Sequence, residues 1–298
     1  MLLKDHIPGD DGELKDLILR ISEMGKRIRE GFISNQGVSD TENIYGETQV
    51  EMDKWADGIL VEGLRHLPYM ASIVSEERDD IVECSPGGSL SVCFDPLDGS
   101  SLMGVNLTVG TIVGIYRSRS PLRPGSEMIG AMYILYGPLT TLVYSVGNGV
   151  HEFALDARGS YVLQRENMRI GDGHIYAPGA LRKDWLPYHR QFIERLESEG
   201  YKLRFCGAFV ADVHQIIIKG GVFTYPAFGN KPSGKLRLLF EANPMGYIVT
   251  NAGGAVSDGN GDILSIQPER LDQRVPVYIG GKREIGIIED EKRKEDEG

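Results

Sequence analysis

The sequence predicts an α/β or α+β fold built in layers. Amphipathic helical patterns occupy residues 14–32 and 52–64, and apolar strand patterns fill residues 108–155. Helical patterns then return between residues 184 and 251. Alternation of this kind, with neighbouring strands in the middle, indicates sheets covered by helices.

Apolar residues at helical spacing mark two N-terminal helices. The apolar set of the first is Leu14, Leu17, Ile18, Ile21, Met24, Ile28 and Phe32. The second has Asp53 in its first turn, and its apolar set is Met52, Trp55, Ala56, Ile59, Leu60 and Leu64. Buried strands are expected at residues 70–75 and 90–94, and we expect Pro96 to end the second strand because proline donates no ladder hydrogen bond.

The middle of the chain predicts an antiparallel meander in a mixed sheet. Gly147-Asn148-Gly149 has the composition and length of a hairpin turn. The strands are expected at residues 108–116, 128–136, 141–146 and 150–155. The meander ends near residues 164–169, so we predict one domain at residues 1–166 and a second at residues 167–298.

Beyond this boundary, helices are expected at residues 184–199, 212–219 and 235–251, the third bent or entered at Pro244. A closing strand is expected at residues 275–279. Residues 289–298 are nearly all charged, which predicts a frayed end.

Composition argues against several classes of function. The 298 residues are 41% hydrophobic and 25% charged, as in globular proteins, and the net charge of −11 leaves no basic stripe for nucleic acid. No apolar run is long enough to span a bilayer, and the first residues lack the apolar segment of a signal peptide. The odd number of cysteines, three, is expected to stay reduced. We therefore predict a cytoplasmic protein with no membrane or nucleic-acid partner.

Paired acids follow two of the predicted strands. Residues 94–101 read Phe-Asp-Pro-Leu-Asp-Gly-Ser-Ser, so two carboxylates precede a loop of small residues with free backbone N–H groups. Glu76-Glu77 follows the strand at residues 70–75. Each pair alone could be a solvated turn. Because parallel-type sheets collect function at strand ends, the two pairs together predict one cluster of cations beside a phosphate.

Several strings resemble class I fructose-1,6-bisphosphatase, a family of metal-dependent, lithium-sensitive sugar phosphatases. They are Ser-Glu-Glu at residues 75–77, Asp-Pro-Leu-Asp-Gly-Ser-Ser at 95–101, Gly-Lys-Leu-Arg-Leu-Leu-Phe-Glu at 234–241 and Asn-Pro-Met at 243–245. The resemblance covers residues 14–279. It implies the sugar phosphatase fold, a sandwich of alternating helix and mixed-sheet layers with the active site between the two halves, and a homotetramer.

The resemblance also implies roles for the acidic residues. Two or three Mg²⁺ ions, with Mn²⁺ or Zn²⁺ as alternatives, would be held by Glu76, Asp95, the Leu97 carbonyl, Asp98 and Glu241. Asp53, Glu77 and Glu47 would orient or deprotonate the attacking water and complete a further metal site. Two of these residues could instead have no catalytic role: Glu47 could be an acid at the start of a helix, and Asp53 could be an ordinary surface residue.

Phosphate binding is implied at two places. Asp98, Gly99, Ser100 and Ser101 would contact the phosphate that leaves. Arg204, Tyr225 and Lys235 would hold the distal phosphate, with the arginine supplied by a neighbouring subunit. His214 is expected to be structural.

Three departures from the family pattern concern specificity and regulation. Arg204-Phe205 replaces an Arg-Tyr pair, and Gly-Asp-Gly-His at residues 171–174 replaces Asn-Glu-Gly-Tyr. Residues 175–182 resemble the sedoheptulose-1,7-bisphosphatase version of this region, where Arg182 would supply the missing phosphate contact. Residues 14–17 and Ser89-Leu90 stand where AMP-inhibited members carry their AMP-binding residues, so we predict no AMP site.

The implied activity is Mg²⁺-dependent hydrolysis of the 1-phosphate of fructose-1,6-bisphosphate to fructose 6-phosphate and phosphate. The nearest alternative is the same chemistry on sedoheptulose-1,7-bisphosphate, or on both sugars. Inositol monophosphatase activity would leave Lys235 and Arg204 without a second phosphate. A non-catalytic metabolite sensor would have lost metal carboxylates, and all of them are present.

Overall fold

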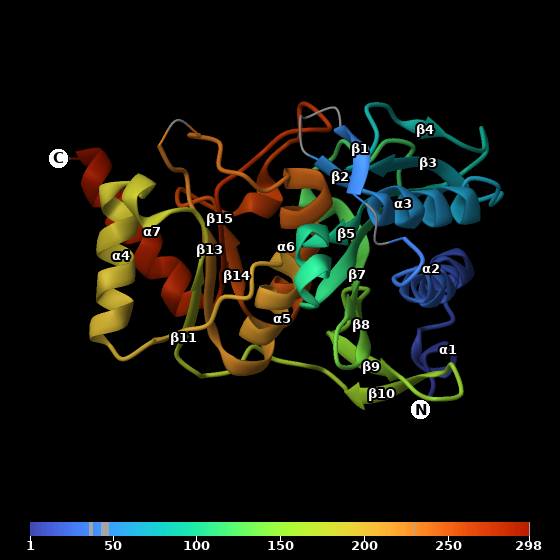
Figure 1. Ribbon diagram of the computed structural model, residues 1–298, viewed down its shortest axis with the longest axis horizontal. Coiled ribbons are helices and arrows are strands. Elements are labelled where there is room, and N and C mark those ends of the chain that lie inside the picture. The colour runs from blue at the N-terminus through green and yellow to red at the C-terminus, as the bar shows by residue number, and fades with distance from the viewer. Residues whose placement is uncertain (36–37, 43–47, 230, 298) are drawn as a thin grey trace.

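The computed structural model describes residues 1–35, 38–42, 48–229 and 231–297. Two large mixed sheets and three layers of helices stack side by side in it (Figure 1). A short antiparallel pair, β1 (Val38–Glu42) and β2 (Thr48–Val50), leads into α3 (Glu51–Leu64). The predicted layered α/β fold is therefore confirmed.

The first sheet has eight strands in the order β10-β9-β8-β7-β6-β5-β3-β4. Strands β3 and β5 are parallel, and the other neighbours are antiparallel, including the predicted meander from β6 onward. The strands are β3 (Met70–Ser75), β4 (Val82–Glu83), β5 (Leu90–Asp98), β6 (Val109–Tyr116), β7 (Met128–Tyr136), β8 (Thr140–Ser145), β9 (His151–Leu155) and β10 (Tyr161–Arg165).

The second sheet has five strands in the order β12-β11-β13-β15-β14. It is mixed, because β11 runs parallel to both of its neighbours and β15 antiparallel to both of its own. Its strands are β11 (Ile175–Pro178), β12 (Lys202–Leu203), β13 (Gly221–Tyr225), β14 (Ala255–Ser257) and β15 (Val277–Gly280). The last of these is the predicted closing strand.

Helices cover both faces of each sheet. One outer layer holds α1 (Leu3–His6), α2 (Gly12–Glu30) and α3, the middle layer α5 (Phe209–Lys219) and α6 (Asn243–Asn251), and the other outer layer α4 (Pro187–Ser198) and α7 (Lys282–Glu297). Neighbouring residues of one strand serve opposite cores: Ile112 faces the middle layer and Val113 the layer of α2 and α3. This period of two explains why β6 is buried along its whole length.

A π-helical turn, Leu238–Ala242, comes directly before α6, and Pro244 lies in the first turn of that helix. The predicted entry at Pro244 is therefore confirmed, although residues 235–237 are not helical. Among the described residues, no helix is both long and apolar enough to cross a membrane.

Two predictions about single residues were wrong. Pro96 does not end β5, because the strand shifts register between Asp95 and Asp98 and the ladder passes over a residue that has no N–H to donate. The Pro96 carbonyl accepts a 2.9 Å hydrogen bond from the Thr111 hydroxyl on β6. Trp55 is 41% exposed, since its ring lies over Gly31 at the end of α2 instead of entering the core.

The charged C-terminal segment is helical up to Glu297 and is not frayed. Its amphipathic start buries Ile285 and Ile288 against the second sheet and α4. Further along, a carboxylate oxygen of Glu295 accepts a 2.6 Å hydrogen bond from the backbone N–H of Tyr188 in the first turn of α4. Tertiary packing has overridden a composition that suggested disorder.

Candidate active site

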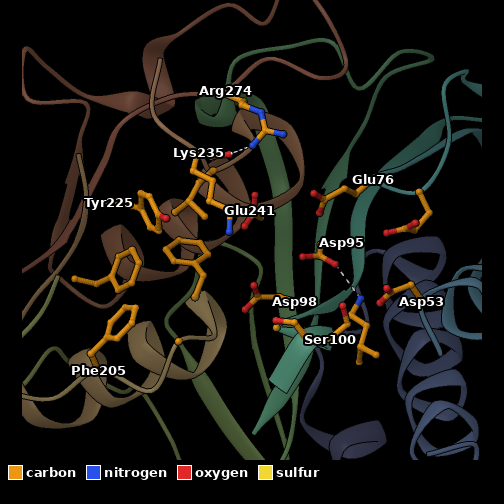
Figure 2. Close-up of a pocket in the computed structure, with 18 residues that line it drawn as sticks. Asp53, Glu76, Asp95, Asp98, Ser100, Phe205, Tyr225, Lys235, Glu241 and Arg274 are labelled. Carbon is orange, nitrogen blue, oxygen red and sulfur yellow. Dashed lines mark hydrogen bonds between the residues drawn. The ribbon is translucent and has the colours of Figure 1, made fainter. Parts of the chain in front are cut away.

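A cavity of about 360 Å³ lies where the ends of β3 and β5 meet the start of α5 and the π-helical turn. Figure 2 shows Glu76, Asp95, Asp98 and Glu241 facing this space, with Lys235 and Tyr225 on one side and Asp53 on the other. The predicted site residues that line the cavity are Asp53, Glu76, Glu77, Asp95, Leu97, Asp98, Gly99, Ser100, Ser101, Tyr225, Lys235 and Glu241.

The two acidic pairs meet because their strands are parallel. Ser75 pairs with Phe94, so Glu76 and Asp95 directly follow neighbouring strand residues at one edge of the sheet. The backbone N–H of Glu76 donates to the Phe94 carbonyl at 3.1 Å, which extends the pairing to this point. The convergence predicted from the two strand ends is present in the fold.

Three carboxylates form the centre of the cavity. One oxygen from each of Asp95, Asp98 and Glu241 lies within 4.8 Å of the other two. All three side chains are buried. Each is held by a backbone N–H group: Leu97 N donates to Asp95 at 2.9 Å, Val210 N to Asp98 at 2.6 Å, and Arg237 N to Glu241 at 2.6 Å.

Burial and mutual repulsion disfavour the charged forms of these acids. Burial, then the Glu76 and Asp98 carboxylates, raises the pKa of Asp95 and of Glu241 well above the usual range. For Asp98 burial is again the largest cause and raises the pKa to about 7, although the hydrogen bond from Val210 N opposes the shift. These backbone bonds fix the carboxylates in place without neutralising them.

The donor set fits a hard divalent cation. Mg²⁺ takes carboxylate, carbonyl and water oxygens, and the buried acids supply several of these within one small space. A cation would also offset the repulsion that, together with burial, raises the pKa of each of these acids, because it favours the ionised forms.

Arg237 is the buried cation beside this cluster. Its Nε donates to Glu76 Oε1 at 3.3 Å, and its side chain is 1% exposed. The only signal for it in the sequence is a single basic residue among the apolar residues of Leu236–Leu239, and this pattern alone predicts no role.

The loop after β5 requires glycine at its first position. Gly99 has φ of +82°, and a Cβ there would come 2.6 Å from the Ala208 Cβ just before α5. The short 3₁₀ helix Ser100–Val105 starts directly after it and places Ser100 and Ser101 on the cavity wall. Close contact between this loop and the start of α5 therefore depends on the missing side chain.

The opposite wall of the cavity is basic and aromatic. The Lys235 ammonium lies 5.9 Å from the centre of the Tyr225 ring, and the exposed Phe205 also lines this wall. Arg274, which the sequence did not reveal, lies here too, and its guanidinium donates to the Lys235 carbonyl. Its segment forms an isolated bridge with Arg237, so only the tertiary fold brings it to the site.

Two of the predicted site residues that the structure describes do not line the cavity. Arg204 is exposed and donates to the neighbouring Leu203 carbonyl at 2.8 Å. Arg182 is also exposed, and its guanidinium lies 3.7 Å from a Glu194 carboxylate oxygen, so the fold gives no support for a phosphate contact from it. His214, which was expected to be structural, does not line the cavity, and its Nδ1 lies 2.8 Å from the Tyr133 hydroxyl. Glu47 lies outside the described residues.

Comparison with known proteins agrees with this geometry. The family model for the fructose-1,6-bisphosphatase N-terminal domain matches residues 8–166, and that for the C-terminal domain matches residues 170–292. A class 1 fructose-1,6-bisphosphatase from Methanocorpusculum labreanum is 49% identical over 97% of this chain and 89% of its own. One from Geobacter sulfurreducens is 47% identical over 95% of this chain and 93% of its own.

Solved structures show the same fold. A Leishmania major fructose-1,6-bisphosphatase in holo form superposes with a TM-score of 0.93 at 30% identity, over 98% of this chain and 99% of the other. A Toxoplasma gondii protein provisionally named sedoheptulose-1,7 bisphosphatase gives a TM-score of 0.90 at 28% identity, over 99% of both chains. With two domain models and close relatives spanning nearly its whole length, this chain belongs to the class 1 fructose-1,6-bisphosphatase family of phosphatases.

Proposed function

We propose that this protein hydrolyses the 1-phosphate of fructose-1,6-bisphosphate, with Mg²⁺, to fructose 6-phosphate and phosphate. The observation that carries the proposal is one cavity with a buried triad of carboxylates, Asp95, Asp98 and Glu241, and a lysine, Lys235, on the opposite wall. A bisphosphate needs both parts of this cavity. Its reacting phosphate requires metal ions held by carboxylates, and its distal phosphate requires a protein cation.

In this proposal, two or three Mg²⁺ ions are held by Glu76, Asp95, the Leu97 carbonyl, Asp98 and Glu241. When bound, such ions would neutralise the phosphoryl oxygens and stabilise the leaving oxygen. Mn²⁺ or Zn²⁺ are the alternatives, because both accept carboxylate ligands.

The remaining residues bind and orient. Asp53 and Glu77 line the same cavity as the acid cluster and would hold the attacking water and accept its proton, with Glu47 as a third candidate that stays a prediction. The backbone N–H groups of Gly99, Ser100 and Ser101 would hold the phosphate that leaves. Because three N–H donors in a fixed loop need no reorganisation, they would favour the charge that develops in the transition state.

The distal phosphate would be bound by Lys235 and the Tyr225 hydroxyl. Arg204 projects from the surface, which suits the proposed supply of this arginine to a neighbouring subunit of a homotetramer. We further propose that residues 1–166 and 167–298 form two domains with the active site between them. A cytoplasmic location, a role in gluconeogenesis and an Arg182 contact stay predictions.

The same chemistry on sedoheptulose-1,7-bisphosphate is the second candidate. Phe205 on the cavity wall supports it, since the fructose enzymes usually carry a tyrosine at this position. The structural similarity to the Toxoplasma gondii protein supports it as well.

The decisive experiment compares phosphate release from the two bisphosphates with Mg²⁺, and again after EDTA. We expect turnover of the fructose substrate that disappears with EDTA and returns with Mg²⁺. A higher kcat/KM for the seven-carbon substrate would favour the second candidate, and metal-independent turnover would contradict both.

A further inference from the structure

Three side chains that could hold a metal ion meet at the far edge of the first sheet, and none of them lines the acidic cavity. They are His6 at the end of α1, His151 at the start of β9 and Glu166 directly after β10. Figure 1 shows α1, β9 and β10 together at this end of the molecule. His151 and Glu166 lie at the open end of the β9–β10 hairpin, and the fold brings His6 to them from the N-terminus of the chain.

Their geometry is that of a ligand set. One ligand atom from each side chain lies within 4.8 Å of the other two. His6 Nε2 lies 3.6 Å from Glu166 Oε1, and the ring centres of His6 and His151 are 4.3 Å apart. Two imidazoles and one carboxylate could thus surround a single ion and leave a position for water.

His151 gives an independent sign that a ligand is missing. Its ring is buried, with 3% of its surface exposed, and its Nε2 atom has no hydrogen-bond partner. An unpartnered buried nitrogen is unfavourable, so native structures rarely keep one without a use.

The surroundings of His6 match those of a ligating histidine. Its Nδ1 lies 2.6 Å from the Tyr144 hydroxyl, which leaves Nε2 on the side of Glu166. Metal-bound histidines usually donate their second ring N–H to a group of this kind, which fixes the tautomer. The Phe153 and Tyr144 rings stack edge-on against His6 and keep the site partly dry.

We propose that His6, His151 and Glu166 form a second divalent-metal site that takes Zn²⁺ in preference to Mg²⁺. Imidazole nitrogens suit Zn²⁺, whereas Mg²⁺ requires oxygen ligands in a nearly octahedral set. This site is independent of the proposed catalysis, because it shares no residue with the acidic cavity.

Metal binding shifts one proton within the His151 ring. In the metal-free protein Asn167 N donates to Nδ1 across 3.3 Å, so the ring proton sits on Nε2. When Nε2 binds the metal, this proton moves to Nδ1 through solvent, and the long bond from Asn167 is given up. Asn167 lies just outside β10 at φ of +53°, where no strand ladder fixes its peptide.

The site would tie three segments together. A bound ion would connect the N-terminal helix, the strand edge and the segment that leads from the first sheet to the second. Because the three ligands meet only in the folded chain, Zn²⁺ would stabilise the native state by mass action.

The test uses the full-length protein and Zn²⁺ itself. After removal of metals with EDTA, Zn²⁺ is titrated in excess Mg²⁺ against a chromophoric chelator. The variants are His6→Gln and Glu166→Gln, whose side chains are less buried than His151, with His66→Gln as a surface-histidine control and Asp98→Asn as the acidic-cavity control. Circular dichroism checks that each variant is folded.

We expect the wild type to bind one more Zn²⁺ ion per chain than His6→Gln. Both control variants should keep this additional equivalent of Zn²⁺. Co²⁺ should give the strong visible absorption of a tetrahedral site in the wild type and in Asp98→Asn, but not in His6→Gln. Zn²⁺ should raise the unfolding midpoint of the wild type and not that of His6→Gln. Equal Zn²⁺ stoichiometry in wild type and folded His6→Gln, or loss of the equivalent in Asp98→Asn, would overturn the proposal.

Discussion

Arg237 donates from Nε to Glu76 Oε1 across 3.3 Å, and this contact joins the segment before the π-helical turn to the end of β3. The arginine is 1% exposed and Glu76 is 16% exposed, so solvent screens the pair weakly. The guanidinium is therefore a fixed counter-charge at the edge of a cavity that contains three buried carboxylates.

Arg237→Met should destabilise the metal-free protein. Removing one partner of a buried pair leaves the other charge uncompensated, at a cost of about 3 kcal/mol in the free energy of unfolding. Urea denaturation in EDTA measures the change, with Arg237→Lys as the charge-preserving control. A wild-type midpoint for Arg237→Met would show that the guanidinium does not compensate the acids.

Asp98→Asn should abolish turnover and leave the fold intact. The amide oxygen can still accept from Val210 N, but the ligand charge is lost, and kcat should fall at least 10³-fold, or about 4 kcal/mol of barrier. Phosphate release is compared with that of Asp80→Asn, an exposed acid. Because one repelling charge is gone, the metal-free variant should unfold no more easily than the wild type. Activity near the Asp80→Asn level would end the metal proposal.

Lys235→Ala should raise KM for the bisphosphate far more than for fructose 1-phosphate. A hydrogen bond to a charged group is worth roughly 1.5–3 kcal/mol, so a tenfold or larger effect on the bisphosphate is expected. Lys231→Ala, an exposed neighbour, is the control. Equal effects on the two substrates would mean that Lys235 does not contact the distal phosphate.

The buried His189 should make stability fall in acid. Burial lowers its pKa to about 3, so below pH 6.5 the unfolded chain binds a proton that the native ring refuses. The contribution of the neutral His189 ring to the free energy of unfolding is therefore fully present above about pH 6.5 and is lost as the pH falls toward 3. Replacing the ring by His189→Phe should remove up to about 1.4 kcal/mol per pH unit from the slope between pH 6 and 5. Urea midpoints at several pH values measure the slope, and identical slopes in both proteins would contradict this assignment.

AMP should leave the rate unchanged. Leu14 and Leu17 are buried in the core, so this face of α2 cannot receive a nucleotide. The Ser89 hydroxyl donates to Glu13 at 2.6 Å, and the nearby Arg117 lies 3.5 Å from the same carboxylate, so a phosphate would meet negative charge there. Rates are measured over a range of AMP concentrations at saturating Mg²⁺, which excludes chelation. A dose-dependent fall in kcat would reveal a nucleotide site.

The sequence was a good guide wherever one local pattern decides the structure. Apolar spacing located α2 and α3, because each helix buries a single stripe. The acids of the site were also visible, because they follow β3 and β5 at the point where parallel strands end together.

Contacts between segments that are distant in the chain could not be predicted from the sequence. Arg274 reaches the cavity through a bridge to Arg237, which is far from it in the chain, and no spacing announces this. The register shift that lets β5 pass Pro96 depends on pairing with β6. The charged end of α7 is held by α4, a partner that composition cannot reveal.

The π-helical turn Leu238–Ala242 has a consequence for insertions and deletions. A wide turn accommodates one residue more than an α-helical turn would. Deleting Ala242, the residue between Glu241 and α6, would restore the ordinary spacing and rotate Glu241 relative to α6 by about 100°. The apolar stripe of α6 would keep its register, so the variant could still fold, but its carboxylate would point away from Asp95 and Asp98. At this position the length of the chain is as restricted as the identity of the side chain.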